Sequence, residues 1–304
     1  MAEWSIIATV KAPSDQVLAF LAHHLPLGPA RIRLCFDDPA DPARAAVAGL
    51  PRVEAMACDD AYWADHRLPR PDKHQARQAF NAQILYRSQP EPWMLHLDVD
   101  EFLAADAPAD TPVAQLLDRV PRHRPVLRIA PWEALHDPTM ADDIFTARHF
   151  RAELSGPHHA DHRAQVFGPY APLLPAGVLS HAIGKCFFRT GIAGLRPWIH
   201  GANIRGERVP PGAPSPEMAV LHFHAQDPGL WRAQLPFRLA RGAYVLKPEL
   251  QAFLQAASPA ELDAFYTQVQ TATPEALALL RREGLLRETS LTLRPKIATL
   301  RSPQ

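Results

Sequence analysis

The sequence predicts an α/β protein: a mixed, mostly parallel sheet with helices on both faces and a helical C-terminal extension. Up to residue 132, short apolar runs that suit buried strands alternate with longer segments whose apolar residues recur at helical spacing. Such alternation is typical of a parallel sheet with helical crossovers. After residue 256, Ser-Pro and Thr-Pro steps each precede a helical pattern, which indicates scaffolding helices at the end of the chain.

The individual elements follow from their spacing. Strands are predicted in short apolar segments at 4–10, 30–38, 93–98, 125–132 and 218–227. Helices are predicted where apolar residues recur every three or four positions, at 14–28, 74–88, 110–120, 228–244, 257–266 and 272–284. Gly28 is a stop signal for the first helix. Thr111 and Pro112 are a suitable N-cap and first-turn pair for the third.

Length and composition set the class of protein. The chain has 304 residues, 47% of them hydrophobic, which is ample for one main domain, expected at 1–245, with an extension packed on it at 246–304. Basic and acidic residues number 32 each, so the charge balance does not indicate a nucleic-acid partner. No apolar run approaches the ~20 residues that span a bilayer, and the N-terminus lacks the pattern of a secretory signal.

The cysteines bear on the compartment. Cys35, Cys58 and Cys186 are odd in number and widely separated, without a Cys-x-x-Cys pair. They are interpreted as reduced thiols of a cytoplasmic protein. Peripheral association with a membrane stays open.

The clearest functional signal is "WMLHLDVDEFL", residues 93–103, where an apolar strand ends in Asp98, Asp100 and Glu101. Carboxylates are rarely buried unless they are paired or bind a cation. Side chains alternate along a strand, so an Asp-x-Asp step places two carboxylates on the same side. Oxygen ligands of this kind suit Mg²⁺, and an added histidine moves the preference toward Mn²⁺. His222 or His224 in "LHFH" could supply it.

A second acidic turn ends the strand at 30–38, in Asp37 and Asp38. Ligands of open α/β sheets bind outside the carboxyl ends of the strands, where both acidic turns are expected. By itself, "DDPADP" is also good turn chemistry. An Asp-x-Asp step alone is a weak motif as well, because it also opens calcium loops and phosphatase sites.

Several motifs together resemble the family-2-type glycosyltransferases, especially those with family-92-like domains. "WMLHLDVDEFL" is similar to the strand that carries their metal motif, and residues 8–41 resemble their opening strand, helix and strand. "RQAFNAQILYRSQPEPW" resembles the helix before the metal strand, with matches at Arg77, Gln78 and Asn81. "GKCFFRTG" and "LHFHAQD" occupy the places of a Gly-Lys strand and a late histidine segment.

The resemblance implies a nucleotide-diphospho-sugar transferase (GT-A) fold and an inverting transfer of a sugar from a nucleotide-sugar donor to a glycan or other hydroxyl acceptor. It implies Mn²⁺ or Mg²⁺ bound by Asp98, Asp100 and one of His222 and His224. Such a transfer needs a carboxylate base, for which the candidates are Glu133, ranked first, Asp137, Asp142 and Asp143. The expected donor-binding residues are Asp37, Asp38, Arg77, Gln78, Asn81, Asp98, Lys185, Arg238 and Arg241.

Two other readings stay open. A metal-dependent phosphoester hydrolase or nucleotidyltransferase could use the same carboxylates, and "HHADH" at 158–162 could bind a metal although it has the pattern of an exposed loop. A protein that binds nucleotide sugars without turnover is the third reading, and the intact acids at 98, 100 and 101 speak against it. The donor sugar, the nucleotide and the acceptor are not encoded in any of these motifs.

Overall fold

The structure is a computed structural model and describes residues 1–105, 111–139, 144–210, 212–240 and 243–301. The chain divides into two compact units, each assembled from segments that are distant in sequence. The first unit contains Met1–Ala130, Ile183–Val220 and Leu293–Gln304, and the second contains Pro131–Ala182 and Leu221–Thr292. The boundary expected between residues 245 and 246 therefore falls inside the second unit.

The first unit is built on a mixed sheet, which confirms the predicted α/β class. Four neighbouring strands run parallel in the order β3 (Val53–Ala57), β2 (Arg31–Phe36), β1 (Trp4–Val10) and β4 (Trp93–His96). Beyond β4 the sheet continues antiparallel with β8 (Lys185–Arg189) and β6 (Val126–Ala134). β12 (Met218–His222) pairs with β6 and with β5 (Glu101–Ala105).

Hydrophobic burial explains why β1 and β4 are central. Every residue of both strands is buried, so neither shows the alternation of a half-exposed strand. On one side of the sheet, Ile7 and Met94 belong to a core cluster that also contains Ile84 and Leu85 of α4 (His74–Arg87). The predicted helix at 74–88 therefore covers the strand that leads to Asp98.

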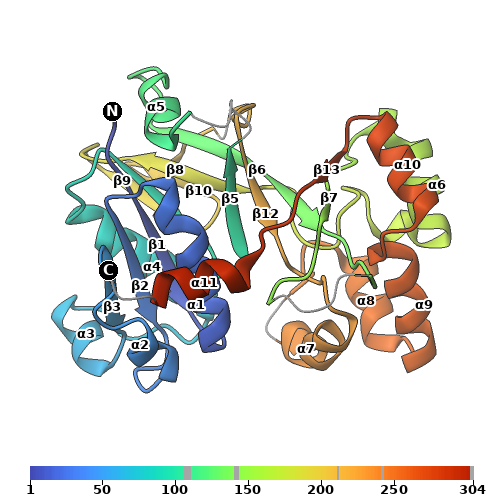
Figure 1. The fold of residues 1–304 in the computed structure, drawn as a ribbon, viewed down its shortest axis with the longest axis horizontal. Helices are drawn as coiled ribbons and strands as arrows, with labels where there is room; N and C mark the ends of the chain where they lie inside the picture. Colours follow the sequence, from blue (N-terminus) through green and yellow to red (C-terminus); the bar gives the residue numbers. More distant parts are fainter. Residues whose placement is uncertain (106–110, 140–143, 211, 241–242, 302–304) are drawn as a thin grey trace. The chain divides into compact units, whose positions relative to one another are not determined.

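The other helices of the first unit are α1 (Ser14–His24), α2 (Pro42–Ala46), α3 (Asp60–Asp65), α5 (Val113–Asp118) and α11 (Leu293–Arg301). α11 packs beside α1, so the end of the chain returns to its beginning (Figure 1). After α1 comes a short 3₁₀ turn, and Gly28 ends it with a φ of 85°, as predicted. The predicted cap of α5 is wrong, because Pro112 itself is the N-cap.

A small antiparallel sheet completes the first unit. It contains β9 (Leu195–Trp198), β10 (Gly201–Ile204) and β11 (Glu207–Arg208), and β9 packs against α4. All three cysteines of the protein are buried and none forms a disulfide.

The second unit is mainly helical. Within this unit, Glu133 and Ala134 at the end of β6 pair antiparallel with β7 (His149–Arg151), and β7 pairs antiparallel with β13 (Leu286–Glu288). Its helices are α6 (Ala160–Phe167), α7 (Pro228–Ala240), α8 (Pro248–Ala256), α9 (Pro259–Gln270) and α10 (Pro274–Arg282). Figure 1 labels each of them. Their shared core includes Trp231, Phe265 and Leu280.

Local sequence chemistry accounts for two of these helix starts. Ser258 of the Ser-Pro step and Glu261 form a capping box at the start of α9, and the hydroxyl of Thr273 in the Thr-Pro step accepts a hydrogen bond from the Ala276 amide at the start of α10. None of the described helices is long and apolar enough to cross a membrane.

Candidate functional site

Asp98 lies two residues after the end of β4, at the carboxyl end of the parallel strands. The amide of Leu97 donates to the carbonyl of Ile7 at 3.0 Å, which keeps the chain on the sheet up to this point. Two side chains then hold the Asp98 carboxylate. Gln78 from α4 donates to Oδ1, and Nζ of Lys185 from β8 donates to Oδ2 at 2.6 Å. All three residues are among those that the sequence predicts to bind the nucleotide-sugar donor.

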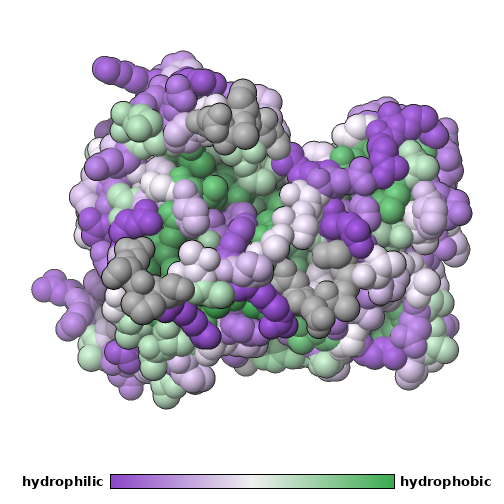
Figure 2. All heavy atoms as spheres, viewed as in Figure 1, coloured by the Kyte–Doolittle hydropathy of each residue, from purple (hydrophilic) through white to green (hydrophobic). Residues whose placement is uncertain are grey.

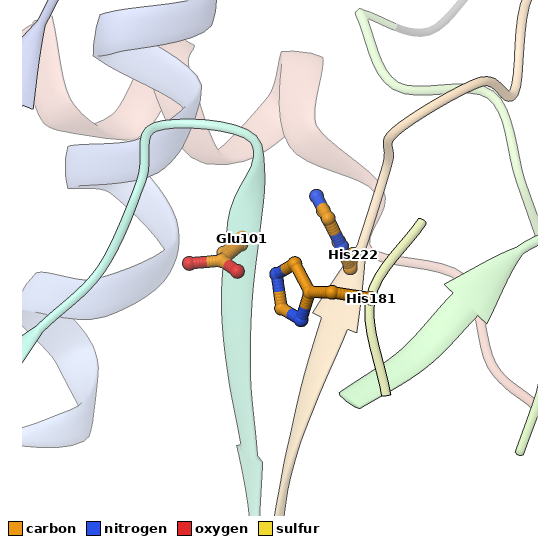
Figure 3. Close-up of side chains that lie close together, drawn as sticks. All are labelled: Glu101, His181 and His222. Atoms are coloured by element: carbon orange, nitrogen blue, oxygen red, sulfur yellow. The ribbon is translucent and has the colours of Figure 1, made fainter. Parts of the chain in front are cut away.

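Glu101 belongs to the same group of charges. It begins β5, its side chain is fully buried, and its Oε2 lies 3.2 Å from Nζ of Lys185. Oε2 also accepts a hydrogen bond from the Asp98 amide at 2.9 Å, while the Glu101 amide donates to the Asp98 carbonyl. Residues 98–101 therefore form a tight turn between β4 and β5, and Figure 3 shows the Glu101 side chain on β5.

Burial and neighbouring charges shift the pKa values of Asp98 and Lys185 in opposite directions. Burial would raise the pKa of Asp98, but the Lys185 ammonium stabilises the carboxylate and holds its pKa below the ordinary value. Burial would lower the pKa of Lys185, and the two carboxylates raise it above the ordinary value instead. The buried His96 has a pKa lowered to about 4, chiefly by burial, so it is neutral at pH 7.

Asp100 lies in the same turn and is partly exposed. Residues 98–101 therefore carry three carboxylates within one turn. A divalent cation would neutralise them, and carboxylate oxygens are its preferred ligands. The charge of the turn thus fits the metal that the sequence predicts.

Two histidines of α1 fix β5 in place. Nδ1 of His24 donates to the carbonyl of Phe20 at 2.8 Å, so its Nε2 is free to accept the Leu103 amide at 3.0 Å. Nε2 of His23 lies 2.8 Å from the Leu103 carbonyl. Sequence reasoning missed this role, because two histidines at a helix end are usually a surface feature.

Asp37, at the end of β2, is surrounded by basic side chains. Arg77 of α4 donates to both carboxylate oxygens at 2.5 and 2.7 Å, Arg70 donates at 3.3 Å, and His74 lies 3.4 Å away. Burial would raise the pKa of Asp37, but His74 and Arg77 lower it well below the ordinary value. This cluster carries net positive charge beside the carboxyl edge of β2.

Asp38 differs, because it is exposed and accepts the Ala40 amide in an ordinary turn.

Asn81, the remaining α4 candidate, is buried. Its amide donates to Oγ1 of Thr9, and its carbonyl oxygen accepts the Tyr62 hydroxyl at 3.0 Å. The matched positions 77, 78 and 81 therefore all lie on the buried face of α4.

The candidate histidines belong to the second unit. His222 ends β12 and is buried, and its ring centroid lies 4.9 Å from that of His181. Figure 3 shows the His181 and His222 side chains next to each other. His224 lies beyond the strand and bonds elsewhere: its Nε2 is 2.9 Å from the Tyr244 hydroxyl. Arg238, a predicted donor-binding residue, donates to the His224 carbonyl at 3.0 Å.

Glu133, the first-ranked base, is buried in β6, and its oxygens are occupied. Arg151 donates to it at 2.5 Å, and the amides of Leu179 and Ser180 donate at 3.0 and 2.6 Å. Burial would raise its pKa, but Arg151 and the Ser180 amide lower it below the ordinary value. Its role as a base stays a prediction.

Lys247 holds the opposite side of the same loop. Its Nζ donates to the carbonyls of Val178, Leu179 and Ser180 at 2.8, 2.9 and 2.5 Å, and burial lowers its pKa to about 8. Glu133 and Lys247 together fix the backbone just before His181. Nothing in the sequence around Lys247 indicated this contact.

Of the other base candidates, Asp137 accepts Arg148 at 2.8 Å. Asp142, Asp143 and the predicted donor-binding Arg241 lie outside the described residues.

In comparisons with known proteins, no family model matches the chain, and the search of curated proteins returns no match.

Proposed function

We propose that the protein is a metal-dependent, inverting glycosyltransferase that moves a sugar from a nucleotide-diphosphate donor to a hydroxyl acceptor. The proposal includes a nucleotide-diphospho-sugar transferase (GT-A) fold. The mixed sheet and the C-terminal helices are compatible with this fold. It follows from the Asp-x-Asp motif and from the family that the sequence resembles.

One observation carries the proposal: Asp98 lies at the carboxyl end of β4 and is held on both oxygens, by Gln78 and Lys185. Open α/β sheets bind ligands at this edge. A carboxylate that is fixed in advance loses little conformational freedom when it takes up a ligand.

The charge of the turn supports a divalent ion. Three acids lie within residues 98–101, and carboxylate oxygens are the ligands that divalent cations prefer. When bound, Mn²⁺ or Mg²⁺ would neutralise the charge that develops on the departing nucleoside diphosphate. In this proposal Lys185 positions Asp98 and Glu101 and does not itself contact the donor, because its fully buried Nζ already contacts both carboxylates.

The cations around Asp37 have the chemistry for the donor phosphates. Nη2 of Arg70 donates to the Asp37 carbonyl at 3.0 Å, but the side chain is 43% exposed, so part of its guanidinium can reach an anion. Arg77 is nearly buried and serves to position Asp37.

Two parts of the predicted site stay predictions. Histidine is a ligand that moves a carboxylate site toward Mn²⁺, and His222 or His224 is the predicted one. The base is predicted among Glu133 and Asp143. Replacement of each residue, with donor binding and transfer measured separately, tests both assignments.

The central experiment is calorimetric titration of wild type and Asp100→Ala with Mn²⁺ and a panel of nucleotide sugars, together with an assay of sugar transfer. One electrostatic contact in the transition state is worth about 3–4 kcal/mol, so we expect transfer to fall by roughly a thousandfold or more. We also expect weaker, no longer Mn²⁺-dependent donor binding in Asp100→Ala.

Asp118→Ala is the matched control, since Asp118 is an exposed acid of the same unit. It should bind donor and transfer sugar as wild type does. Equal Mn²⁺-dependent donor affinity in wild type and Asp100→Ala would refute the metal site. Hydrolysis of a phosphoester without sugar transfer would favour the hydrolase reading instead.

A further inference from the structure

A second group of histidines lies in the second unit, in the tract "HHADH". His158 and His159 end the 3₁₀ turn η2 (Pro157–His159), and His162 lies in the first turn of α6. The ring centroids of His159 and His162 are 5.4 Å apart, and those of His158 and His159 are 4.2 Å apart. Figure 2 shows hydrophilic side chains on the surface over the neighbouring α10.

The two facing nitrogen atoms have the spacing of metal ligands. Nδ1 of His159 lies 3.1 Å from Nδ1 of His162. Zinc–imidazole bonds are about 2.0–2.1 Å long, so two nitrogens at tetrahedral or right angles on one ion are about 2.9–3.4 Å apart. Both side chains can therefore reach a single ion with little rearrangement.

An acid lies behind one of the rings. Nε2 of His162, the nitrogen that faces away from His159, is 3.7 Å from Oε2 of Glu283 after α10. Metal-binding histidines commonly direct their second ring nitrogen at a carboxylate, which fixes the tautomer with the lone pair toward the metal. Glu283 is placed to do this for His162.

The backbone before the histidines is also fixed. Arg163 donates to the carbonyls of Leu154 and Gly156 at 2.5 and 2.8 Å. Gly156 has a φ of 84°, and a Cβ there would come within 2.9 Å of the His158 ring. The Arg163 hydrogen bonds and the conformation of Gly156 therefore fix the turn that carries His159.

We propose that His159 and His162 bind a first-row transition metal such as Zn²⁺ through their Nδ1 atoms, with Glu283 orienting His162. Water would occupy the remaining positions. Imidazole favours Zn²⁺, Ni²⁺ and Cu²⁺ over Mg²⁺ and Mn²⁺, so this site differs in metal preference from the carboxylate turn at 98–101. It is independent of the proposed glycosyltransferase function.

Calorimetric titration of the full, untagged protein with ZnCl₂ at pH 7.5 tests the site. We expect the double variant His159→Ala/His162→Ala to lose one equivalent of bound Zn²⁺, and Glu283→Gln to bind that equivalent about tenfold more weakly. His158→Ala is the matched control and should bind within about threefold of wild type. Asp98→Asn should keep this equivalent, because it alters only the carboxylate turn.

Thermal melting without metal shows whether each variant is folded, and both single histidine variants are measured beside the double one. Zn²⁺ should raise the melting temperature of wild type and of His158→Ala, but not of the double variant. An unchanged Zn²⁺ stoichiometry in the folded double variant would overturn the proposal. So would an equal loss in His158→Ala, since binding would then belong to the tract as a whole.

Discussion

The ammonium group of Lys185 lies 2.6 Å from Oδ2 of Asp98, and the Lys185 side chain is fully buried. The same nitrogen lies 3.2 Å from Oε2 of Glu101. Lys185 thus provides, from β8, positive charge in the turn where the sequence predicts a metal. A bound metal and Lys185 would both neutralise the charge of Asp98 and Glu101. Replacing Lys185 and adding metal therefore tests the contribution of each.

Lys185→Met should destabilise the fold, because it leaves two acids without their buried ammonium. Removing one partner of a buried ion pair costs about 3–5 kcal/mol in the free energy of unfolding. Mn²⁺ should restore part of this loss if the carboxylates bind it. Urea unfolding with and without MnCl₂ measures both effects.

Lys73→Met is the control for this variant, since Lys73 is exposed just before α4. Its unfolding free energy should stay within about 0.5 kcal/mol of wild type. A Lys185→Met protein of wild-type stability would show that the ion pair contributes nothing to the fold. If Mn²⁺ left the variant unchanged, the acids would not be ligands.

Acid should destabilise the protein well above the range in which carboxylates titrate. Burial lowers the pKa of His23 and of His96 to about 4 and that of His24 far below its ordinary value, 6.5. The unfolded chain therefore takes up protons below pH 6.5 that the folded chain does not bind. The stability from neutral histidines is complete above pH 6.5 and is lost as the pH falls toward 4.

The magnitude is on the order of 3 kcal/mol at pH 4 for a group whose pKa falls from 6.5 to about 4. Urea unfolding between pH 7.5 and 4.5 measures the slope. His96→Leu should flatten it, because this variant removes one buried titrating group. His66→Gln, a change at an exposed histidine, should leave it as in wild type. A wild-type slope in His96→Leu would mean that His96 is protonated in the folded state.

Glu133→Gln should lower stability, because Glu133 accepts hydrogen bonds from Arg151, Leu179 and Ser180 and is 1% exposed. The change leaves the buried Arg151 without its carboxylate, at a cost of about 3–5 kcal/mol in unfolding free energy. Thermal and urea unfolding measure this effect, and Glu133→Gln/Arg151→Met should recover part of it.

The same variants separate the two roles of Glu133. A base role predicts a fall in transfer of at least a hundredfold at unchanged stability. The contacts predict the opposite pattern, with loss of stability first and with transfer partly recovered in the double variant. Full stability together with lost transfer in Glu133→Gln would show that the contacts are dispensable.

The sequence by itself determined the elements whose signals are local. The periodicity of 4–10, 14–28, 74–88 and 93–98 predicted β1, α1, α4 and β4, and the Ser258 and Thr273 caps predicted the starts of α9 and α10. These features depend on neighbours within a few residues, so one sequence suffices to find them. Asp98 also stood out, because a carboxylate at the end of a buried strand needs compensation.

Only the tertiary structure decided which basic side chain pairs with each buried acid. Asp98 and Lys185 are 87 residues apart, and their contact depends on β8 pairing antiparallel with β4. Asp37 and Arg77, 40 residues apart, meet because α4 covers the parallel strands. The three carbonyl acceptors of Lys247 belong to a loop that no local pattern links to it. Residue types and spacing reveal that a charge needs a partner, but its identity depends on how distant segments pack, and packing is a property of the whole chain.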